Sequence, residues 1–373
     1  MKRLQQHYII QDLKKKMVVI TGPRQAGKTW LAQNIASTYG NSTYLNYDDQ
    51  DHRAIIETKA WLHDTELLVL DELHKMPMWK NYLKGVYDTK HKELNILVTG
   101  SARLDVYDHM GDSMAGRYFR HRLLPLSLSE LHYIGYQATL NDLLARSGFP
   151  EPFLEHDEIE VERWRQQYFA SLLTTDLLEF GSINHINSMR TILELLRRSV
   201  GSPISMQSIA RDVKLSPTSV KKYIDILEAL YIIFKVTPYS RNIARSILKE
   251  PKIYFFDSGM VIGDIGAKIE NLTAFSLLKY CYGLTDYKAQ THKLHYLRTK
   301  DGKEVDFALV HDQELIWLIE VKHKDKDISK HLKYFCNKYH VSGVQVVKEL
   351  VSEYQQDEIQ VRNLEDYLKG LAF

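Results

Sequence analysis

The chain has 373 residues, 44% of them hydrophobic and 26% charged, and it lacks the Pro, Gly or Gln tracts of a disordered protein. This length exceeds what one hydrophobic core usually supports, so two or three domains are expected instead of one. The net charge of +2 gives no global attraction to nucleic acid. Two cysteines are too few for a disulfide framework, and no apolar run reaches the ~20 residues of a membrane span. The last two observations favour a cytoplasmic protein with no membrane partner.

The first predicted elements are short apolar strands that alternate with helical segments. A glycine-containing loop and then a helix over residues 29–37 follow the first strand. Alternation of strands with helices is typical of a parallel α/β sheet, so we expect an α/β domain over residues 1–135. Strands are expected over residues 17–21, 43–47, 66–70 and 95–99.

A phosphate-binding loop is predicted between the first strand and the first helix. Backbone N–H groups of such a loop can bind phosphate oxygens, Lys28 can neutralise the β and γ phosphates, and the Thr29 hydroxyl can bind Mg²⁺. A chance glycine-rich turn is the alternative, and the strand–loop–helix context argues against it. The loop therefore predicts ATP and Mg²⁺ as cofactors. Its residues match G-x-x-x-x-G-K-[ST] in full: Gly22, Pro23, Arg24, Gln25, Ala26, Gly27, Lys28 and Thr29.

An acidic pair ends the strand predicted over residues 66–70. Asp71 and Glu72 would lie at the carboxyl edge of the sheet, where open α/β sheets bind ligands. Asp71 is the candidate ligand of Mg²⁺, and Glu72 is the candidate base that orients and activates the attacking water. By itself an acidic pair after a strand is equally consistent with a solvated turn, but the upstream loop favours the catalytic interpretation.

Two further candidates follow in the same domain. Thr99 or Ser101, at the end of the next strand, could contact the γ-phosphate, although Thr/Ser-Gly turns are common after strands. Arg117 is the candidate transition-state arginine, and an ordinary surface arginine is the alternative.

Helical patterns dominate the middle of the chain. Residues 136–200 are expected to form a helical connector, interrupted by the turn-forming sequence SGFPEP. Residues 201–240 predict a winged helix, in which two short helices precede the strand-like sequence YIIFKV. A module that packs against protein is the alternative to one that binds DNA. Seven basic residues on or near these elements suit DNA phosphates: Arg211, Lys214, Lys221, Lys222, Lys235, Arg241 and Arg245.

The C-terminal part, residues 241–373, is expected to form a separate α/β domain. Asp306 begins one predicted strand, and Glu320 and Lys322 end the next. Residues i and i+2 of a strand share a face, so Glu320 and Lys322 project together, and a hairpin partner could bring Asp306 beside them. Asp306 and Glu320 would then hold Mg²⁺, with Lys322 orienting a metal-bound water; a cross-strand salt bridge is the alternative.

With these residues in place, nearly the whole chain resembles the prokaryotic AAA-type ATPases that carry a C-terminal domain of unknown function, DUF4143. The resemblance rests on the ordered motifs GPRQAGKT, VLDELHK, LVTGSA, MAGR, SGFPEP, YFFDSGM and EVDFAL with LIEVK. This sequence departs from the family pattern at two positions: His74 stands where the family has Gln, and Ser147 stands where the family has Gly. The resemblance implies a C-terminal fold similar to the PD-(D/E)xK nucleases, in which Glu270 would be a further metal ligand. It also implies ring assembly, with Arg117 acting on a neighbouring subunit.

Two functional hypotheses remain open. The first is an ATP-hydrolysing machine, assembled as a homo-oligomer, that acts on DNA through the winged helix and the nuclease-like domain. The second is a signalling switch of the STAND type, in which nucleotide exchange changes assembly and the C-terminal domain binds a partner without cleavage. Fast, DNA-stimulated hydrolysis would favour the machine, whereas tightly retained nucleotide would favour the switch.

Overall fold

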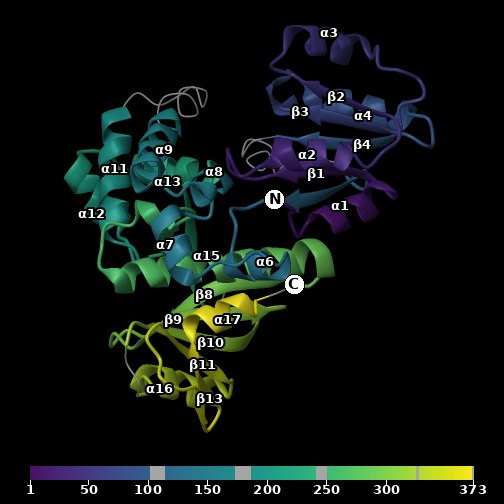
Figure 1. Cartoon of the computed structure of the whole chain (residues 1–373). Helices are drawn as coiled ribbons and strands as arrows, with labels where there is room; N and C mark the ends of the chain where they lie inside the picture. Colours follow the sequence, from purple (N-terminus) through teal and green to yellow (C-terminus); the bar gives the residue numbers. More distant parts are fainter. Residues whose placement is uncertain (101–113, 173–185, 241–249, 325–326, 372–373) are drawn as a thin grey trace. The chain divides into compact units, whose positions relative to one another are not determined.

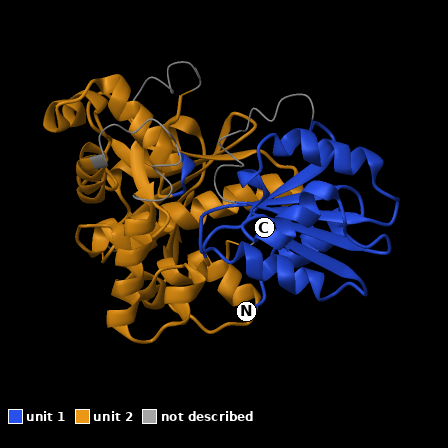
Figure 2. Cartoon of the chain, turned by 90° about the horizontal axis from the view of Figure 1, so that it is seen from above, with its two compact units in different colours: residues 1–125, 229–231 blue, residues 126–228, 232–373 orange. Residues whose placement is uncertain are grey.

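The computed structural model describes the chain except for residues 101–113, 173–185, 241–249, 325–326 and 372–373 (Figure 1). The chain forms two compact units, coloured separately in Figure 2. Unit 1 contains residues 1–125 and 229–231, and unit 2 contains residues 126–228 and 232–373.

Unit 1 is built on a parallel sheet with the strand order β2-β3-β4-β1-β5. Every residue of β1 and β3 is buried, which explains why both strands are continuous apolar runs: helices cover each face of a parallel sheet. The order confirms the α/β fold expected from the sequence. The five strands are β1 (Met17–Thr21), β2 (Ser42–Asn46), β3 (Leu67–Asp71), β4 (Asn95–Thr99) and β5 (Tyr118–Arg122).

Two hydrophobic cores flank this sheet because successive strand residues point to opposite faces. Val18 and Ile20 of β1 pack into one core, together with residues of α1 and α2. Val19 packs into the other core, together with residues of α3 and α4. A shift of the strand by one residue would exchange these faces, so the two cores fix its register. The helices are α1 (Gln6–Leu13), α2 (Lys28–Ala36), α3 (Gln50–Thr58) and α4 (Trp79–Thr89), with a short 3-10 helix η1 (Leu73–Lys75).

Unit 2 begins with a set of helices. The predicted turn SGFPEP separates two of them: Ser147 ends one helix with a positive φ of 75°, and Pro150 begins the next. Phe149 between them is buried and packs on Trp164 and Tyr168, with ring centroids 5.4 and 5.0 Å away. The turn is therefore anchored by an aromatic cluster. The helices are α6 (Leu128–Tyr133), α7 (Leu140–Arg146), α8 (Pro150–Leu154), α9 (Glu158–Ser171), α11 (Ile186–Arg198), α12 (Met206–Val213) and α13 (Pro217–Ala229).

An eight-stranded sheet forms the rest of unit 2, in the order β12-β13-β11-β10-β9-β8-β6-β7. The strand expected as the wing, β6, pairs antiparallel with β7 and parallel with β8, so it is part of this sheet. The domain limits drawn from the sequence stay predictions. The strands are β6 (Ile233–Pro238), β7 (Lys252–Phe255), β8 (His292–Arg298), β9 (Glu304–His311), β10 (Glu314–Lys322), β11 (Gly343–Val347), β12 (Tyr354–Gln356) and β13 (Ile359–Asn363).

The helices that accompany this sheet are α15 (Ile265–Lys288), α16 (Lys330–Tyr339) and α17 (Leu364–Lys369), with a 3-10 helix η3 (Ser258–Met260). Lys279 of α15 forms a buried ion pair with Glu130 of α6, and the two side chains are 4% and 0% exposed. In the part of the chain that the structure describes, no helix combines the length and the apolar character needed to cross a membrane. The cytoplasmic location expected from the sequence stays a prediction.

Candidate functional site

The loop between β1 and α2 depends on glycine at two positions. Gly22 has φ of 141°, and a Cβ atom there would lie 2.2 Å from the carbonyl oxygen of Leu123. Gly27 has φ of 90° and forms the left-handed N-cap of α2. Both conformations are accessible to glycine and strained for other residues. The loop can therefore pass close to the backbone after β5 and turn directly into the helix.

Two cationic side chains hold this loop. Lys28 is buried, and its ammonium group donates hydrogen bonds to the carbonyl oxygens of Gly22 at 3.0 Å and Pro23 at 2.7 Å. Arg3 is also buried and donates to the carbonyl oxygens of Ala26 at 2.7 Å and Leu124 at 2.6 Å. Lys28 was predicted from its motif, whereas Arg3 was not. Its position before α1 gives no sequence signal for a contact with residues so far along the chain.

Asp71 gathers hydroxyl donors at the carboxyl end of β3. Its carboxylate accepts from the Thr29 hydroxyl at 2.8 Å, from the Tyr44 hydroxyl at 2.6 Å and from the Thr99 hydroxyl. Burial and the contact with Asp71 raise the pKa of Tyr44 above its ordinary value, so this phenol remains a donor. Tyr44 was missed by the sequence analysis. The only sequence signal was its place within the strand predicted over residues 43–47.

The pair Thr29 and Asp71 fits the predicted role in binding Mg²⁺. One hydroxyl and one carboxylate from different elements meet here, and Mg²⁺ is commonly held by few protein oxygens, with water and phosphate oxygens as its other ligands. Of the two alternatives for a polar contact after β4, Thr99 is the one that touches Asp71. Ser101 lies outside the described residues.

Glu72 differs from its neighbour in both backbone and surroundings. Its backbone is left-handed, with φ of 55°. Burial raises the pKa of its carboxyl group, Lys28 lowers it and Asp71 raises it again, with a net increase above the ordinary value. His74 Nδ1 lies 3.5 Å and Lys75 Nζ 3.9 Å from Glu72 Oε2. A carboxylate with a raised pKa, close to Lys28, is suited to accept a proton.

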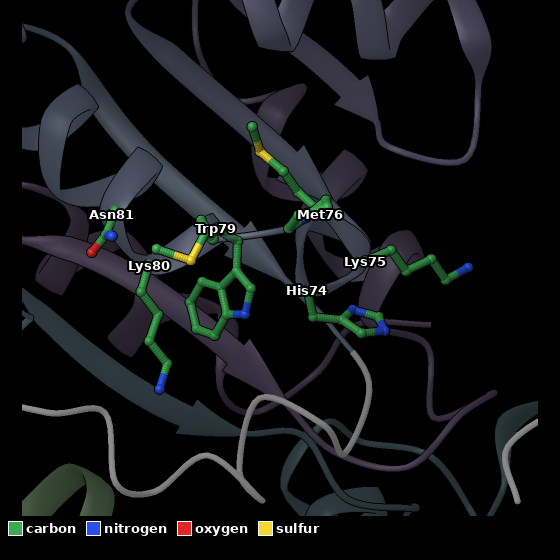
Figure 3. A pocket seen from close by; sticks show the side chains of 8 residues that line it. His74, Lys75, Met76, Trp79, Lys80 and Asn81 are labelled. Atoms are coloured by element: carbon green, nitrogen blue, oxygen red, sulfur yellow. The ribbon is translucent and has the colours of Figure 1, made fainter. Parts of the chain in front are cut away.

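A pocket of about 470 Å³ follows Glu72 along the chain and is lined by the residues from His74 to Asn81. Figure 3 shows the side chains of His74, Met76 and Trp79 at this pocket. Met78 is 71% exposed and has a left-handed backbone, with φ of 57°. The pocket thus combines apolar and basic side chains next to the predicted catalytic base.

Arg117 is not brought to the loop of its own chain. It precedes β5, whose first residue pairs with Met17, the first residue of β1, whereas the loop follows the last residue of β1. Arg117 therefore lies at the opposite edge of the sheet. There its guanidinium group binds Asp88 of α4, with Nε–Oδ1 and Nη2–Oδ2 distances of 2.8 and 3.1 Å.

Four of the basic residues predicted for DNA contact are exposed on α12, α13 or the turn between them: Arg211, Lys214, Lys221 and Lys222. Lys235 is different, because its ammonium group pairs with Asp225 at 2.7 Å and Glu228 at 2.5 Å. Arg241 and Arg245 lie outside the described residues. The exposed basic face is therefore narrower than the sequence suggested.

The C-terminal carboxylates come together across two antiparallel strands. Ile319 of β10 pairs with Phe307 of β9, so Glu320 and Asp306 are neighbours across the strands. Asp306 accepts a hydrogen bond from the backbone N–H of Val321 at 2.9 Å. Lys322 Nζ lies 2.9 Å from Glu320 Oε1, so these two residues form an ion pair within β10.

Lys252 of β7 lies among the same carboxylates and was missed by the sequence analysis. Its side chain is 1% exposed, and Nζ lies 2.7 Å from Glu304 Oε1, 3.4 Å from Glu270 Oε1 and 3.8 Å from Asp306 Oδ1. Burial opposes its charge, but the three carboxylates raise the pKa of Lys252 above its ordinary value, so it stays an ammonium group. In the sequence it was only the first residue of an apolar strand.

The predicted metal ligands Glu270, Asp306 and Glu320 do not fit a divalent cation in this arrangement. Over the described ranges, no three or more His, Cys, Asp or Glu side chains are grouped so that they could hold a metal ion. The physical reason is the ammonium group of Lys252, which contacts two of the three predicted ligands. The role predicted for Lys322 stays a prediction; in the structure its ammonium group lies 2.9 Å from Glu320 Oε1.

Three family models match successive parts of the chain. Residues 14–132 match an AAA domain. Residues 137–268 match a domain of unknown function, DUF8612, and residues 265–367 match another, DUF4143.

Relatives of the chain occur in bacteria and archaea. An uncharacterised protein of Mycobacterium tuberculosis is 27% identical over 246 residues, which are 66% of this chain and 55% of that protein. The chain thus spans about half the length of this relative. An uncharacterised protein of Haemophilus influenzae is 24% identical over 88% of this chain and 92% of its own length. One from Methanocaldococcus jannaschii is 22% identical over 87% of this chain and 80% of its own length.

Solved structures with a similar fold include a Walker-type ATPase of Pyrococcus abyssi, with a TM-score of 0.45 and 12% identity over 69% of this chain and 93% of that one. The RuvB Holliday junction branch migration motor of Thermotoga maritima has a TM-score of 0.32 and 18% identity over 62% of this chain and 87% of that one. These scores are low, so the fold assignment rests on the strand order and on the family models.

Proposed function

We propose that the chain, which matches an AAA domain over residues 14–132 and DUF4143 over residues 265–367, binds and hydrolyses ATP. The observation that carries the proposal is the contact between Thr29 and Asp71, at 2.8 Å, beside the loop held by Lys28. It joins the predicted phosphate-binding loop to the predicted acidic strand end, as hydrolysis requires.

Each residue has a separate role in this proposal. Lys28 and the loop N–H groups bind the phosphates, and Thr29 and Asp71 hold Mg²⁺. The bound Mg²⁺ supplies charge neutralisation at the β and γ phosphates. Glu72 orients the attacking water and accepts its proton, and the raised pKa of this carboxyl group brings it closer to the working pH.

We extend the proposal to DNA as a partner of unit 2. The basic face of α12 and α13 supports it, because Arg211, Lys214, Lys221 and Lys222 are exposed and phosphate contacts supply most of the affinity for nucleic acid. Assembly into a homo-oligomeric ring, with Arg117 acting on a neighbour, remains part of the same proposal. It requires Arg117 to exchange Asp88 for a phosphate of the adjacent subunit.

The second candidate function is a nucleotide-dependent switch of the STAND type. The position of Lys252 favours it, because a C-terminal domain whose carboxylates are paired with an ammonium group is better suited to binding than to metal-dependent cleavage. The switch and the machine share the nucleotide site and differ in turnover.

The test measures ATP affinity and steady-state hydrolysis with and without single-stranded and duplex DNA. Lys28→Ala should lose most ATP affinity because the point charge at the phosphates is gone. Unchanged affinity in a calorimetric titration would refute the nucleotide site. DNA-stimulated turnover supports the machine, whereas slow hydrolysis with nucleotide retained through gel filtration supports the switch.

A further inference from the structure

The C-terminal acidic cluster consists of Glu270 of α15, Glu304 and Asp306 of β9, and Glu320 of β10. Lys252 reaches it from β7, a strand at the edge of the sheet. The hydroxyl group of Tyr254 donates to Glu270 at 2.7 Å. The cluster thus draws side chains from one helix and three strands.

The charges of this cluster are nearly balanced by the chain itself. Four carboxylates face three cationic groups. Lys252 contacts Glu270, Glu304 and Asp306, Arg298 lies 3.0 Å from Glu304, and Lys322 lies 2.9 Å from Glu320. Burying charges is costly unless they are paired and hydrogen bonded, and this pairing offsets that cost.

The ammonium group also takes the place that a metal would need. A hard cation binds carboxylate oxygens at ~2.0–2.6 Å from a shared central point. Lys252 Nζ lies within 2.7 to 3.8 Å of oxygens from three of the four carboxylates, so it occupies such a central point itself. Like charges at this separation repel strongly in a buried environment, so the ammonium group and a divalent cation exclude each other.

We propose that Lys252 is the resident cation of the acidic cluster, and that this side chain replaces a divalent metal in holding the carboxylates together. Removal of the ammonium group would leave the buried carboxylates without their shared cation, so another cation could take its place. This inference is independent of ATP hydrolysis, because it concerns only residues of unit 2.

Backbone packing around the cluster supports a fixed position for Glu270. Gly201 has φ of 78°, and a Cβ atom at that residue would lie 2.7 Å from Glu270 Oε2. The backbone of Pro203, two residues later, forms an isolated bridge with Lys252. The chain before α12 therefore packs directly on the lysine and on one of its partners.

The test is Mn²⁺ binding by nucleotide-free protein, measured by calorimetry and by the shift of the thermal unfolding midpoint. Lys252→Met keeps an unbranched side chain of similar length and removes the charge. We expect it to unfold at a lower temperature than wild type, to gain one Mn²⁺ site, and to recover stability with Mn²⁺ and lose it again with EDTA. Lys293→Met, at an exposed lysine of β8, is the matched control and should behave as wild type.

A second variant covers the case in which Lys252→Met does not fold. Lys252→Met/Glu270→Gln removes one charge of each sign, so it should fold better than Lys252→Met and should gain less Mn²⁺ affinity. Any Mn²⁺ bound by Thr29 and Asp71 is common to all variants. The proposal is overturned if wild type binds Mn²⁺ at a site that Glu270→Gln abolishes. It is also overturned if Lys252→Met retains wild-type stability, if Lys252→Met folds and gains no Mn²⁺ site, or if the double variant is no more stable than Lys252→Met.

Discussion

Asp71 and Glu72 are adjacent carboxylates that the fold places in different environments. Asp71 accepts from Thr29, Tyr44 and Thr99, so its charge is satisfied by hydroxyl groups. Glu72 turns away through a left-handed backbone, and burial raises the pKa of its carboxyl group. Asp71 is thus engaged by hydroxyl donors, whereas Glu72 is suited to take up a proton.

Glu72→Gln should leave ATP binding intact and slow hydrolysis, because the amide cannot accept the proton of the attacking water. It should also change the pH dependence of stability. The pKa of Glu72 is raised in the folded chain, so its contribution to stability is present below the ordinary carboxyl value of 4.5 and is lost as the pH rises through the folded-state value.

The glutamine stays neutral throughout, so nucleotide-free Glu72→Gln should unfold at a higher temperature than wild type at about pH 8, and the difference should vanish near about pH 4. Thermal unfolding followed by circular dichroism measures this. Glu93→Gln, at an exposed residue, is the control. Equal hydrolysis rates for Glu72→Gln and wild type would show that another group is the base.

Arg3→Ala tests whether a residue outside the motif shapes the nucleotide loop. It removes two buried hydrogen bonds, to Ala26 and Leu124, and should cost about 1–3 kcal/mol of stability because the carbonyl oxygens lose their partner. ATP affinity should fall although Arg3 belongs to no phosphate-binding motif. Lys2→Ala, at the exposed neighbouring residue, should change neither property. If Arg3→Ala binds ATP as tightly as wild type does, the hydrogen bonds of Arg3 do not shape the nucleotide loop.

Helix α13 presents two kinds of side chain. Tyr223 and Leu227 are buried and form its core face, whereas Lys221 and Lys222 are exposed. A DNA-binding role for this helix depends on the exposed lysines, since the buried face is already committed to packing.

Lys221→Ala/Lys222→Ala should weaken DNA binding about equally across sequences and should reduce the slope of log affinity against log salt concentration by about 0.9 for each lost phosphate contact. Fluorescence anisotropy with a labelled duplex measures both. Lys293→Ala, in β8, is the control for a general loss of positive charge. If the double variant binds DNA as wild type does, the face packs against protein instead.

The elements that were predicted best are those whose signal is local. Strands β1 and β4 have the expected limits because their apolar residues are contiguous. Strand β5 was not predicted: its sequence YFRHR has no apolar run, and as an edge strand it is only partly buried. Periodicity cannot reveal a strand that buries so little.

The same distinction holds for the two sites. The loop of Gly22–Thr29 and the pair Asp71 and Glu72 are contiguous motifs, so the sequence located them. Arg3, Tyr44 and Lys252 act through partners from 18 to 121 residues away, and such contacts depend on the tertiary fold. The metal site was expected because the sequence shows its carboxylates in a recognisable pattern. The sequence does not show that the fold places the ammonium group of Lys252 among them.

The whole assembly is tested by mixing subunits. If Arg117 acts on the nucleotide of a neighbour, Arg117→Ala and Glu72→Gln subunits should each hydrolyse ATP slowly alone and recover part of the activity when mixed, because some interfaces then combine an intact arginine with an intact glutamate. Hydrolysis after subunit exchange is the measurement. Mixtures that exchange subunits, shown by fluorescence energy transfer, yet stay inactive would count against action between subunits.

The buried ion pair between Glu130 and Lys279 constrains how this chain can evolve. Glu130 belongs to the segment matched by the AAA model and Lys279 to the segment matched by the DUF4143 model. Breaking a buried ion pair by removing one partner costs about 3–5 kcal/mol, whereas joint replacement by apolar residues is often tolerated. The two positions, 149 residues apart, should therefore vary together among homologues. A recombination event that joins a foreign C-terminal segment to this N-terminal one is therefore favoured when it also brings a basic residue to pair with Glu130.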